Sequence, residues 1–133
     1  MNQCLMYITL VVEDYDAAIE FYTQKLNFVL IEDTVLNESK RWVLVSPQGS
    51  AGCCLLLAKA VSEEQKSRIG NQTGGRVFLF LQTDDLIRDF EALKSRGVEI
   101  IRKPSIEEYG KVVVFSDLYG NLWDLIEPCN KSI

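Results

Sequence analysis

The sequence repeats itself once, and this repeat constrains the fold more than any other feature. Residues 7–14 and 76–83 both have the pattern of a short alternating strand, and each precedes a helical pattern with an aromatic residue at matching depth, Phe21 and Phe90. The two strands, like the two aromatic residues, are 69 positions apart. A stacked solenoid needs about three units or more to bury its core. Two copies therefore predict one domain built from a pair of similar modules.

Each module is expected to run in the order β-α-β-β-β. The first module is predicted over residues 4–58, the second over 76–128, and a polar connector over 59–75, all within a single domain of residues 1–133. Helical apolar stripes predict helices over 17–25 and about 84–96. Strands are predicted over 4–12, 28–31, 41–46 and 53–58 in the first module and over 76–82, 98–102, 111–115 and 122–127 in the second.

Local signals predict how some of these elements begin and end. Asp14 or Asp16 can cap the first helix, and Asn27 fits the left-handed residue that follows it. A turn is expected over 47–52, and residues 62–68 can form a short helical turn inside the connector.

Composition narrows the class of protein. The chain is 47% apolar and 25% charged, the balance of a folded globular protein. Its net charge of −5 disfavours nucleic acid as a partner, because phosphate binding needs a basic face. No apolar run is long enough to cross a membrane, and no signal peptide is apparent. We therefore expect a cytoplasmic protein with neither nucleic acid nor membrane as a partner.

The chain contains no histidine, which removes the commonest metal ligand and the usual general base. Four cysteines, Cys4, Cys53, Cys54 and Cys129, lack the spacing of a disulfide framework or of a zinc site. We interpret them as small buried apolar residues.

Both ends of the sequence resemble the vicinal oxygen chelate superfamily, which includes glyoxalase I, bleomycin-resistance proteins and extradiol dioxygenases. Residues 12–14, 21–22 and 25–28 are similar to its opening signature V-x-D, F-Y and L-G-F, and residues 115–127 are similar to its ending F-x-D-P-D-G-N-x-x-E-L-x-E. The resemblance implies an α+β fold in which two βαβββ modules form a curled mixed sheet around an open cleft, with helices outside. It also implies a homodimer.

In the metal-dependent members, four inward positions supply His, Glu, His and Glu to one divalent ion. The resemblance carries these positions onto Tyr7, Leu56, Arg76 and Asp124. Only Asp124 could be an ordinary metal ligand, because arginine cannot offer a lone pair and leucine has none. We therefore expect no metal and no other cofactor.

Arg76 and Asp124 could instead act as a pair. If both face the cleft, as the resemblance implies, the guanidinium takes the place of a metal ion and could bind an anionic or carbonyl-bearing ligand. Alternatively, the two form only a salt bridge between strands. If Arg76 and Tyr7 face the cleft, strand alternation places Phe78 inward with Arg76, and Thr9 inward with Tyr7.

These observations predict a metal-independent protein that binds a small organic ligand, anionic or aromatic, through Tyr7, Thr9, Leu56, Arg76, Phe78 and Asp124. No catalytic residue is assigned, and enzyme activity stays open. One alternative is a metal-dependent lyase like glyoxalase I, or a dioxygenase, with a metal near Asp124 and further ligands such as Glu127 or Glu13. A second is a non-catalytic structural or regulatory dimer.

Overall fold

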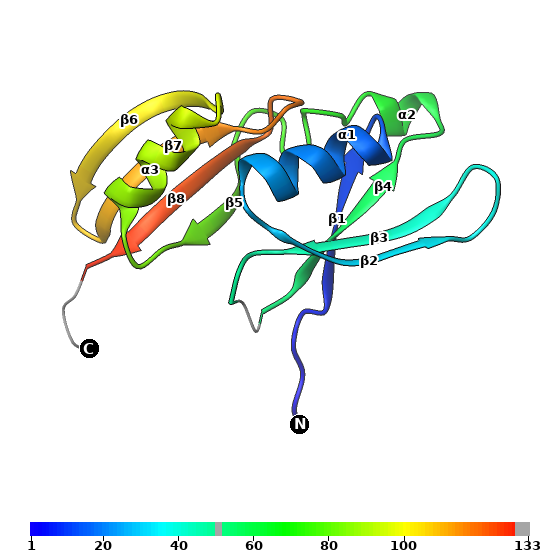
Figure 1. Cartoon of the computed structure of the whole chain (residues 1–133), viewed down its shortest axis with the longest axis horizontal. Helices are drawn as coiled ribbons and strands as arrows, with labels where there is room; N and C mark the ends of the chain where they lie inside the picture. The colour runs from blue at the N-terminus through cyan, green and yellow to red at the C-terminus, as the bar shows by residue number, and fades with distance from the viewer. Residues whose placement is uncertain (50–51, 130–133) are drawn as a thin grey trace. The chain divides into compact units, whose positions relative to one another are not determined.

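The chain forms two compact units, shown as a computed structural model in Figure 1. The structure describes residues 1–49 and 52–129. Unit 1 comprises Met1–Ile69, and unit 2 begins at Gly70. The boundary lies inside the connector predicted over 59–75.

Unit 1 contains one mixed four-stranded sheet in the order β1-β4-β3-β2. β1 and β4 pair in parallel, whereas β2–β3 and β3–β4 are antiparallel. In chain order, the elements are β1 (Tyr7–Val12), α1 (Tyr15–Glu20), the π-helical turn η1 (Phe21–Lys25), β2 (Val29–Val35), β3 (Arg41–Ser46), β4 (Cys54–Lys59) and α2 (Glu63–Lys66).

Unit 2 repeats this arrangement, with strand order β5-β8-β7-β6. Its elements are β5 (Val77–Gln82), α3 (Leu86–Ser95), β6 (Glu99–Glu107), β7 (Gly110–Ser116) and β8 (Leu122–Pro128). The β5–β8 pair is parallel, and the other pairs are antiparallel. The predicted α+β class and the two βαβββ modules are confirmed, and each module forms its own mixed sheet.

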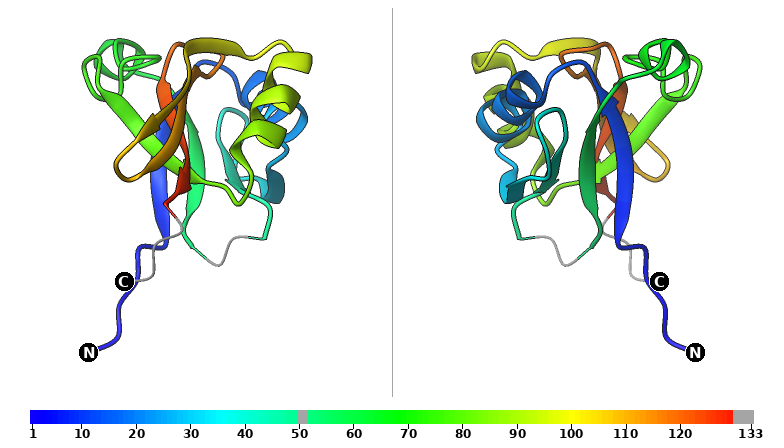
Figure 2. Two further views of the ribbon diagram at one scale, coloured as in Figure 1. Left: turned by 90° about the vertical axis from the view of Figure 1, so that its left-hand side faces the viewer. Right: turned by 90° about the vertical axis from the view of Figure 1, so that its right-hand side faces the viewer.

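The core of unit 1 lies between its sheet and the first helix. Leu10 and Val12 of β1 are fully buried, as are Ala18 of α1 and Tyr22 of η1. Full burial of one such aliphatic side chain contributes about 1.5–3 kcal/mol. Because side chains alternate along a strand, Tyr7, Thr9 and Val11 occupy the opposite face of β1, here called the open face. Figure 2 shows β1 beside β4 at this edge of the sheet.

The first helix begins at an aspartate cap. The Asp14 carboxylate accepts a hydrogen bond of 2.8 Å from the Ala17 backbone N–H, so Asp14 rather than Asp16 is the cap. The predicted helix over 17–25 is α-helical only to Glu20 and continues as a π-helical turn. Asn27 has φ 61°, which confirms the left-handed residue predicted after it.

Two strands extend by several residues beyond their predicted ends. β2 and β6 were predicted over 28–31 and 98–102, but hairpin pairing carries them on to Val35 and Glu107. Polar side chains and Pro104 obscure the alternation there, although backbone pairing with β3 and β7 continues. Within the connector, α2 confirms the predicted helical turn. The turn predicted over 47–52 includes residues 50 and 51, which lie outside the described residues.

The interpretation of all four cysteines as buried is wrong. Cys4 and Cys129 are exposed, while Cys53 and Cys54 are half-buried. Cys4 precedes β1 and Cys129 follows β8, so neither belongs to a strand that would carry its side chain into a core.

Candidate functional site

Strand pairing brings two of the predicted site residues together on the open face of the first sheet. Thr9 of β1 pairs with Leu56 of β4, and Val11 pairs with Ala58. Paired residues point to the same side of a sheet, so these four side chains form one mostly apolar surface. Their small or aliphatic character leaves room above the strands.

A cavity of about 430 Å³ lies over this surface. Its volume falls within the range of about 300–1,000 Å³ that is usual for small-molecule sites. Thr9, Val11, Leu56 and Ala58 contribute to its wall. The other lining residues come from the adjoining helices, loops and strands: Tyr15, Asn37, Ser39, Lys40, Arg41, Trp42, Leu57, Lys59, Val61 and Gln65.

Trp42 gives the cavity an aromatic side. Its ring is half-buried and meets the ring of Tyr7 edge to face, with centroids 5.9 Å apart and planes at 75°. Such T-shaped contacts contribute about 0.5–1.5 kcal/mol beyond burial. Tyr7, a predicted site residue, does not line the cavity but contacts a residue that does.

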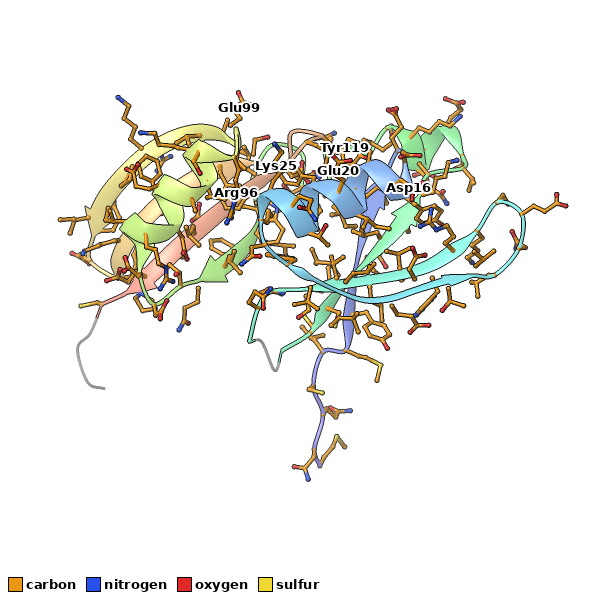
Figure 3. The ribbon with its side chains drawn as sticks, viewed as in Figure 1. Asp16, Glu20, Lys25, Arg96, Glu99 and Tyr119 are labelled. Carbon is orange, nitrogen blue, oxygen red and sulfur yellow. The ribbon has the colours of Figure 1, made fainter. Side chains whose placement is uncertain are left out.

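An ion-pair network holds one rim of the cavity. Arg41 donates two hydrogen bonds to the Asp33 carboxylate, from Nε at 3.0 Å and Nη2 at 2.6 Å, and a third from Nη1 to Asp16 at 2.9 Å. Figure 3 shows Asp16 near the start of α1. The Arg41 guanidinium also lies over the Tyr15 ring, 5.2 Å from its centroid. The network therefore ties β2 and β3 to α1.

The same contacts shift the ionisation of the groups involved. The hydrogen bonds from Arg41 lower the pKa of Asp33, and its positive charge adds to this effect. Asp33 and Asp16 in turn raise the pKa of Arg41. Asp33 and Arg41 are therefore both ionised at neutral pH.

The short helix α2 contributes Gln65 to the cavity, and hydrogen bonds at the start of this helix hold Gln65 in place. The Ser62 hydroxyl accepts a hydrogen bond from the Gln65 backbone N–H at 3.1 Å. The Gln65 side-chain oxygen accepts one from the Val61 backbone N–H at 2.8 Å. This reciprocal pattern resembles a capping box and fixes the position of Gln65.

Unit 2 carries Asp124 on β8. Its register partners are Phe80 of β5 and Val114 of β7, and Arg102 of β6 pairs with Val114. Burial raises the pKa of the Asp124 carboxyl, while the positive charge of Arg102 opposes the shift. Phe80 beside it is 65% exposed.

The predicted pairing of Arg76 with Asp124 is not present. Arg76 is exposed, precedes β5 and forms no ion pair within the described residues. The register shifts by one residue between Val77 and Leu79, so Val77 rather than Arg76 shares the face of Asp124. Phe78 lies at this shift. The alternation that would have placed Arg76 and Phe78 inward with Asp124 is broken there.

Several cavity residues were not predicted from the sequence. Trp42 cannot be assigned to one face from the sequence, because both faces of its strand are apolar. The hairpin and connector residues Asn37, Lys40, Lys59 and Gln65 lie where no periodic pattern exists. The polar residues and the glycines around 59–75 were a compositional signal for a loop, but not for a binding site.

The donor set does not fit the superfamily's divalent metal. Tyr7, Leu56 and Arg76 offer a neutral phenol, an alkyl group and a cation, which leaves Asp124 as the one ordinary ligand among the four positions. Across residues 1–49 and 52–129, no three Cys, Asp or Glu side chains gather in a group that could hold a metal ion. Glu127 is also engaged, because it accepts a hydrogen bond of 2.9 Å from the Leu86 backbone N–H.

None of the helices in the described part of the chain is long and apolar enough to span a bilayer.

Several known proteins match this chain over nearly its whole length. An uncharacterised protein from Shewanella frigidimarina is 57% identical over 98% of both chains. The solved structure of UcmS2 is 27% identical, with a TM-score of 0.83 over 96% of this chain and 99% of that one. TnmS3, described as an antibiotic binding protein from Streptomyces sp. CB03234, is 27% identical, with a TM-score of 0.77 over 97% of this chain and 98% of that one. The family model named Glyoxalase/Bleomycin resistance protein/Dioxygenase superfamily matches residues 5–125, and the chain belongs to that family.

Proposed function

We propose that the protein binds a small organic molecule in the cavity of unit 1, without a metal ion and without making or breaking a bond. The observation that carries the proposal is the cavity of about 430 Å³, with its apolar wall, its aromatic side and its polar rim. A mostly apolar concavity with a few placed polar groups is the usual form of a small-molecule site.

The similarity to TnmS3 supports a ligand of antibiotic type. That relative is described as an antibiotic binding protein, and this chain covers nearly all of its length. Binding alone would require neither a general base nor a metal, in keeping with the absence of histidine. Thr9 and Leu56 are proposed to contact the ligand directly, with Tyr7 supporting Trp42.

Three residues of unit 2 stay predictions as ligand-binding residues: Arg76, Phe78 and Asp124. The raised pKa of Asp124 supports such a role, because perturbed carboxyl groups are common at functional sites. The homodimer also stays a prediction. Ile31 and Val35 of the edge strand β2, which are 53% and 70% exposed, are candidates for burial in it. The cytoplasmic location and the lack of a nucleic-acid partner stay predictions.

The proposal can be tested by thermal shift and calorimetry on protein stripped with EDTA. The panel should contain planar aromatic compounds such as naphthol, naphthoate and an anthraquinone carboxylate. A ligand present at 100 times its Kd stabilises a folded protein by about 2.7 kcal/mol, which raises Tm measurably. We expect at least one member of the panel to bind with 1:1 stoichiometry.

A cavity-filling variant localises the binding. Ala58→Leu adds three carbon atoms inside the cavity, and we expect it to weaken binding by about tenfold or more, since overlap with the ligand would force repacking. Ala17→Leu is the matched control, because Ala17 is exposed on α1 and does not line the cavity. Equal affinity in the two variants would exclude this cavity as the site.

A further inference from the structure

We infer that the cavity selects a planar aromatic ligand that carries a negative charge, such as an aromatic carboxylate. This inference rests on the proposed function and adds the charge of the ligand. It follows from the charged and amide side chains that line the cavity: three cations and two amides, with no carboxylate among the described lining residues. The carboxylates of Asp33 and Asp16, which pair with Arg41 at one rim, do not themselves line the cavity.

Two of the three cations in the lining are available to a ligand. Lys40 and Lys59 form no ion pair within the part of the chain that the structure describes, and both are exposed. Arg41 differs, because its Nε and both terminal nitrogens already donate to Asp33 and Asp16. Positive charge at this rim is therefore supplied mainly by the two lysines.

The two side-chain amides in the lining, those of Asn37 and Gln65, add hydrogen-bond donors that, like the lysines, favour a ligand with acceptor groups. The Asn37 side-chain oxygen accepts hydrogen bonds from the Ser39 backbone N–H at 2.9 Å and from its hydroxyl at 3.2 Å. The Gln65 side-chain oxygen accepts from the Val61 backbone N–H. With both oxygens engaged, each amide still offers its NH₂ group, a donor. A ligand rich in acceptors complements such a rim.

The absence of carboxylates from the described lining residues contrasts with the acidic charge of the whole chain. The protein carries a net charge of −5, so a randomly chosen surface of this area would be expected to contain carboxylates. A concave site lined by one sign of charge concentrates ligands of the opposite sign. An anion would thus be attracted to this cavity despite the acidic character of the chain.

The shape of the wall favours a flat ligand. Thr9, Leu56 and Ala58 project from paired strands to the same side of the sheet, and Trp42 lines the cavity with them. Aromatic rings prefer offset-stacked or edge-to-face contacts with such a neighbour. A planar ring system could lie on the strands with its anionic group toward Lys40 and Lys59.

Calorimetry with three probes of the same ring system tests this inference: naphthoate, naphthamide and naphthylmethylammonium. For wild-type protein at low salt, we expect naphthoate to bind about fivefold to tenfold more tightly than naphthamide, since each exposed charge pair contributes up to about fivefold. The ammonium probe should bind most weakly. The advantage of naphthoate should shrink in about 0.3 M salt, where screening shortens the range of charge interactions.

The double variant K40Q/K59Q assigns the preference to these lysines. Within this variant, the ratio of naphthoate to naphthamide affinity should fall to about one, whatever the affinity for naphthamide itself. The control K25Q/K103Q changes the net charge equally at residues that do not line the cavity, and it should retain the advantage.

Each remaining outcome overturns a defined claim. Equal binding of naphthoate and naphthamide, tighter binding of the ammonium probe, or equal losses in the two double variants would overturn the inferred anion selectivity and leave the proposed function standing. Failure of all three probes, together with the neutral members of the panel above, would overturn both.

Discussion

At the scale of single residues, Asp33 and Asp124 have pKa values shifted in opposite directions and illustrate opposite relations between charge and stability. Asp33 accepts two hydrogen bonds from Arg41, which favour its ionised form. Asp124 is partly buried beside apolar neighbours, and burial favours its neutral form. The first carboxylate stabilises the fold when charged, and the second destabilises it.

Asp124→Asn should therefore stabilise the protein at neutral pH. Because the pKa of Asp124 is higher in the folded than in the unfolded chain, its charge costs stability as the pH rises from about 3.9 through the folded value. Asparagine removes this cost, so Tm at pH 7 should rise above that of wild type. The gain should disappear near pH 3, where the carboxyl is protonated in both states.

Asp84→Asn is the control with the opposite sign. Arg88 lowers the pKa of Asp84, so removal of this charge should not raise Tm at pH 7. A lower Tm for Asp124→Asn at pH 7 would contradict the assigned direction of its pKa shift.

At the scale of secondary-structure elements, the hairpin between β2 and β3 positions much of the cavity rim. It contributes Asn37, Ser39 and Lys40, and the backbone N–H groups of Leu36 and Asn37 both donate to the Lys40 carbonyl. Arg41 then joins this hairpin to α1. The rim thus depends on contacts between elements that are distant in sequence.

Replacing Arg41 by Lys should loosen this hairpin. Lysine cannot form the two parallel hydrogen bonds to Asp33, so we expect the free energy of unfolding to fall by about 0.5–1 kcal/mol at pH 7. The lowered pKa of Asp33 means that its contribution is present above the unfolded value of about 3.9 and is lost as the pH falls through the folded value. Urea unfolding should therefore show a smaller difference in the free energy of unfolding between wild type and Arg41→Lys at pH 3 than at pH 7.

Arg88→Lys provides the comparison in unit 2. Arg88 also contacts two aspartates, but its side chain is 57% exposed and that of Asp84 is 86% exposed, whereas Arg41 and Asp33 are 24% and 27% exposed. Solvent screens the exposed pair, so this variant should change stability much less. An equal loss in both variants would contradict the role assigned to the Arg41 network.

The strands also show which structural features could be predicted from the sequence and which could not. The order of elements could be predicted because each strand and helix has its own periodicity, and the repeat supplied an internal check. The sheet face on which Arg76 lies could not be predicted. A one-residue register shift between Val77 and Leu79 does not change the sequence pattern when the whole segment is apolar. Trp42 was ambiguous for a related reason, since Val43, Leu44 and Val45 after it are all apolar.

At the scale of the whole molecule, the two modules share one strand order but differ in what they offer a ligand. In unit 1, Thr9 and Leu56 could be predicted from alternation, whereas Lys40, Lys59 and Gln65 lie in or beside loops whose positions depend on tertiary contacts. Unit 2 presents Asp124 and Phe80 on its sheet. The repeat in sequence therefore specifies the scaffold, and the departures from it specify the site.

The central claim is that unit 1 binds its ligand without a metal ion, and the fluorescence of Trp42 tests it most directly. The chain has two tryptophans, so Trp123→Phe leaves Trp42 as the one reporter, at the cavity itself. We expect the best ligand of the aromatic panel to change Trp42 emission saturably with 1:1 stoichiometry in EDTA. Zinc, nickel, manganese or iron(II), added to a sample without EDTA, should leave its affinity unchanged. A response absent in EDTA that appears only with one of these metals would contradict the account and favour a metal-dependent lyase or dioxygenase.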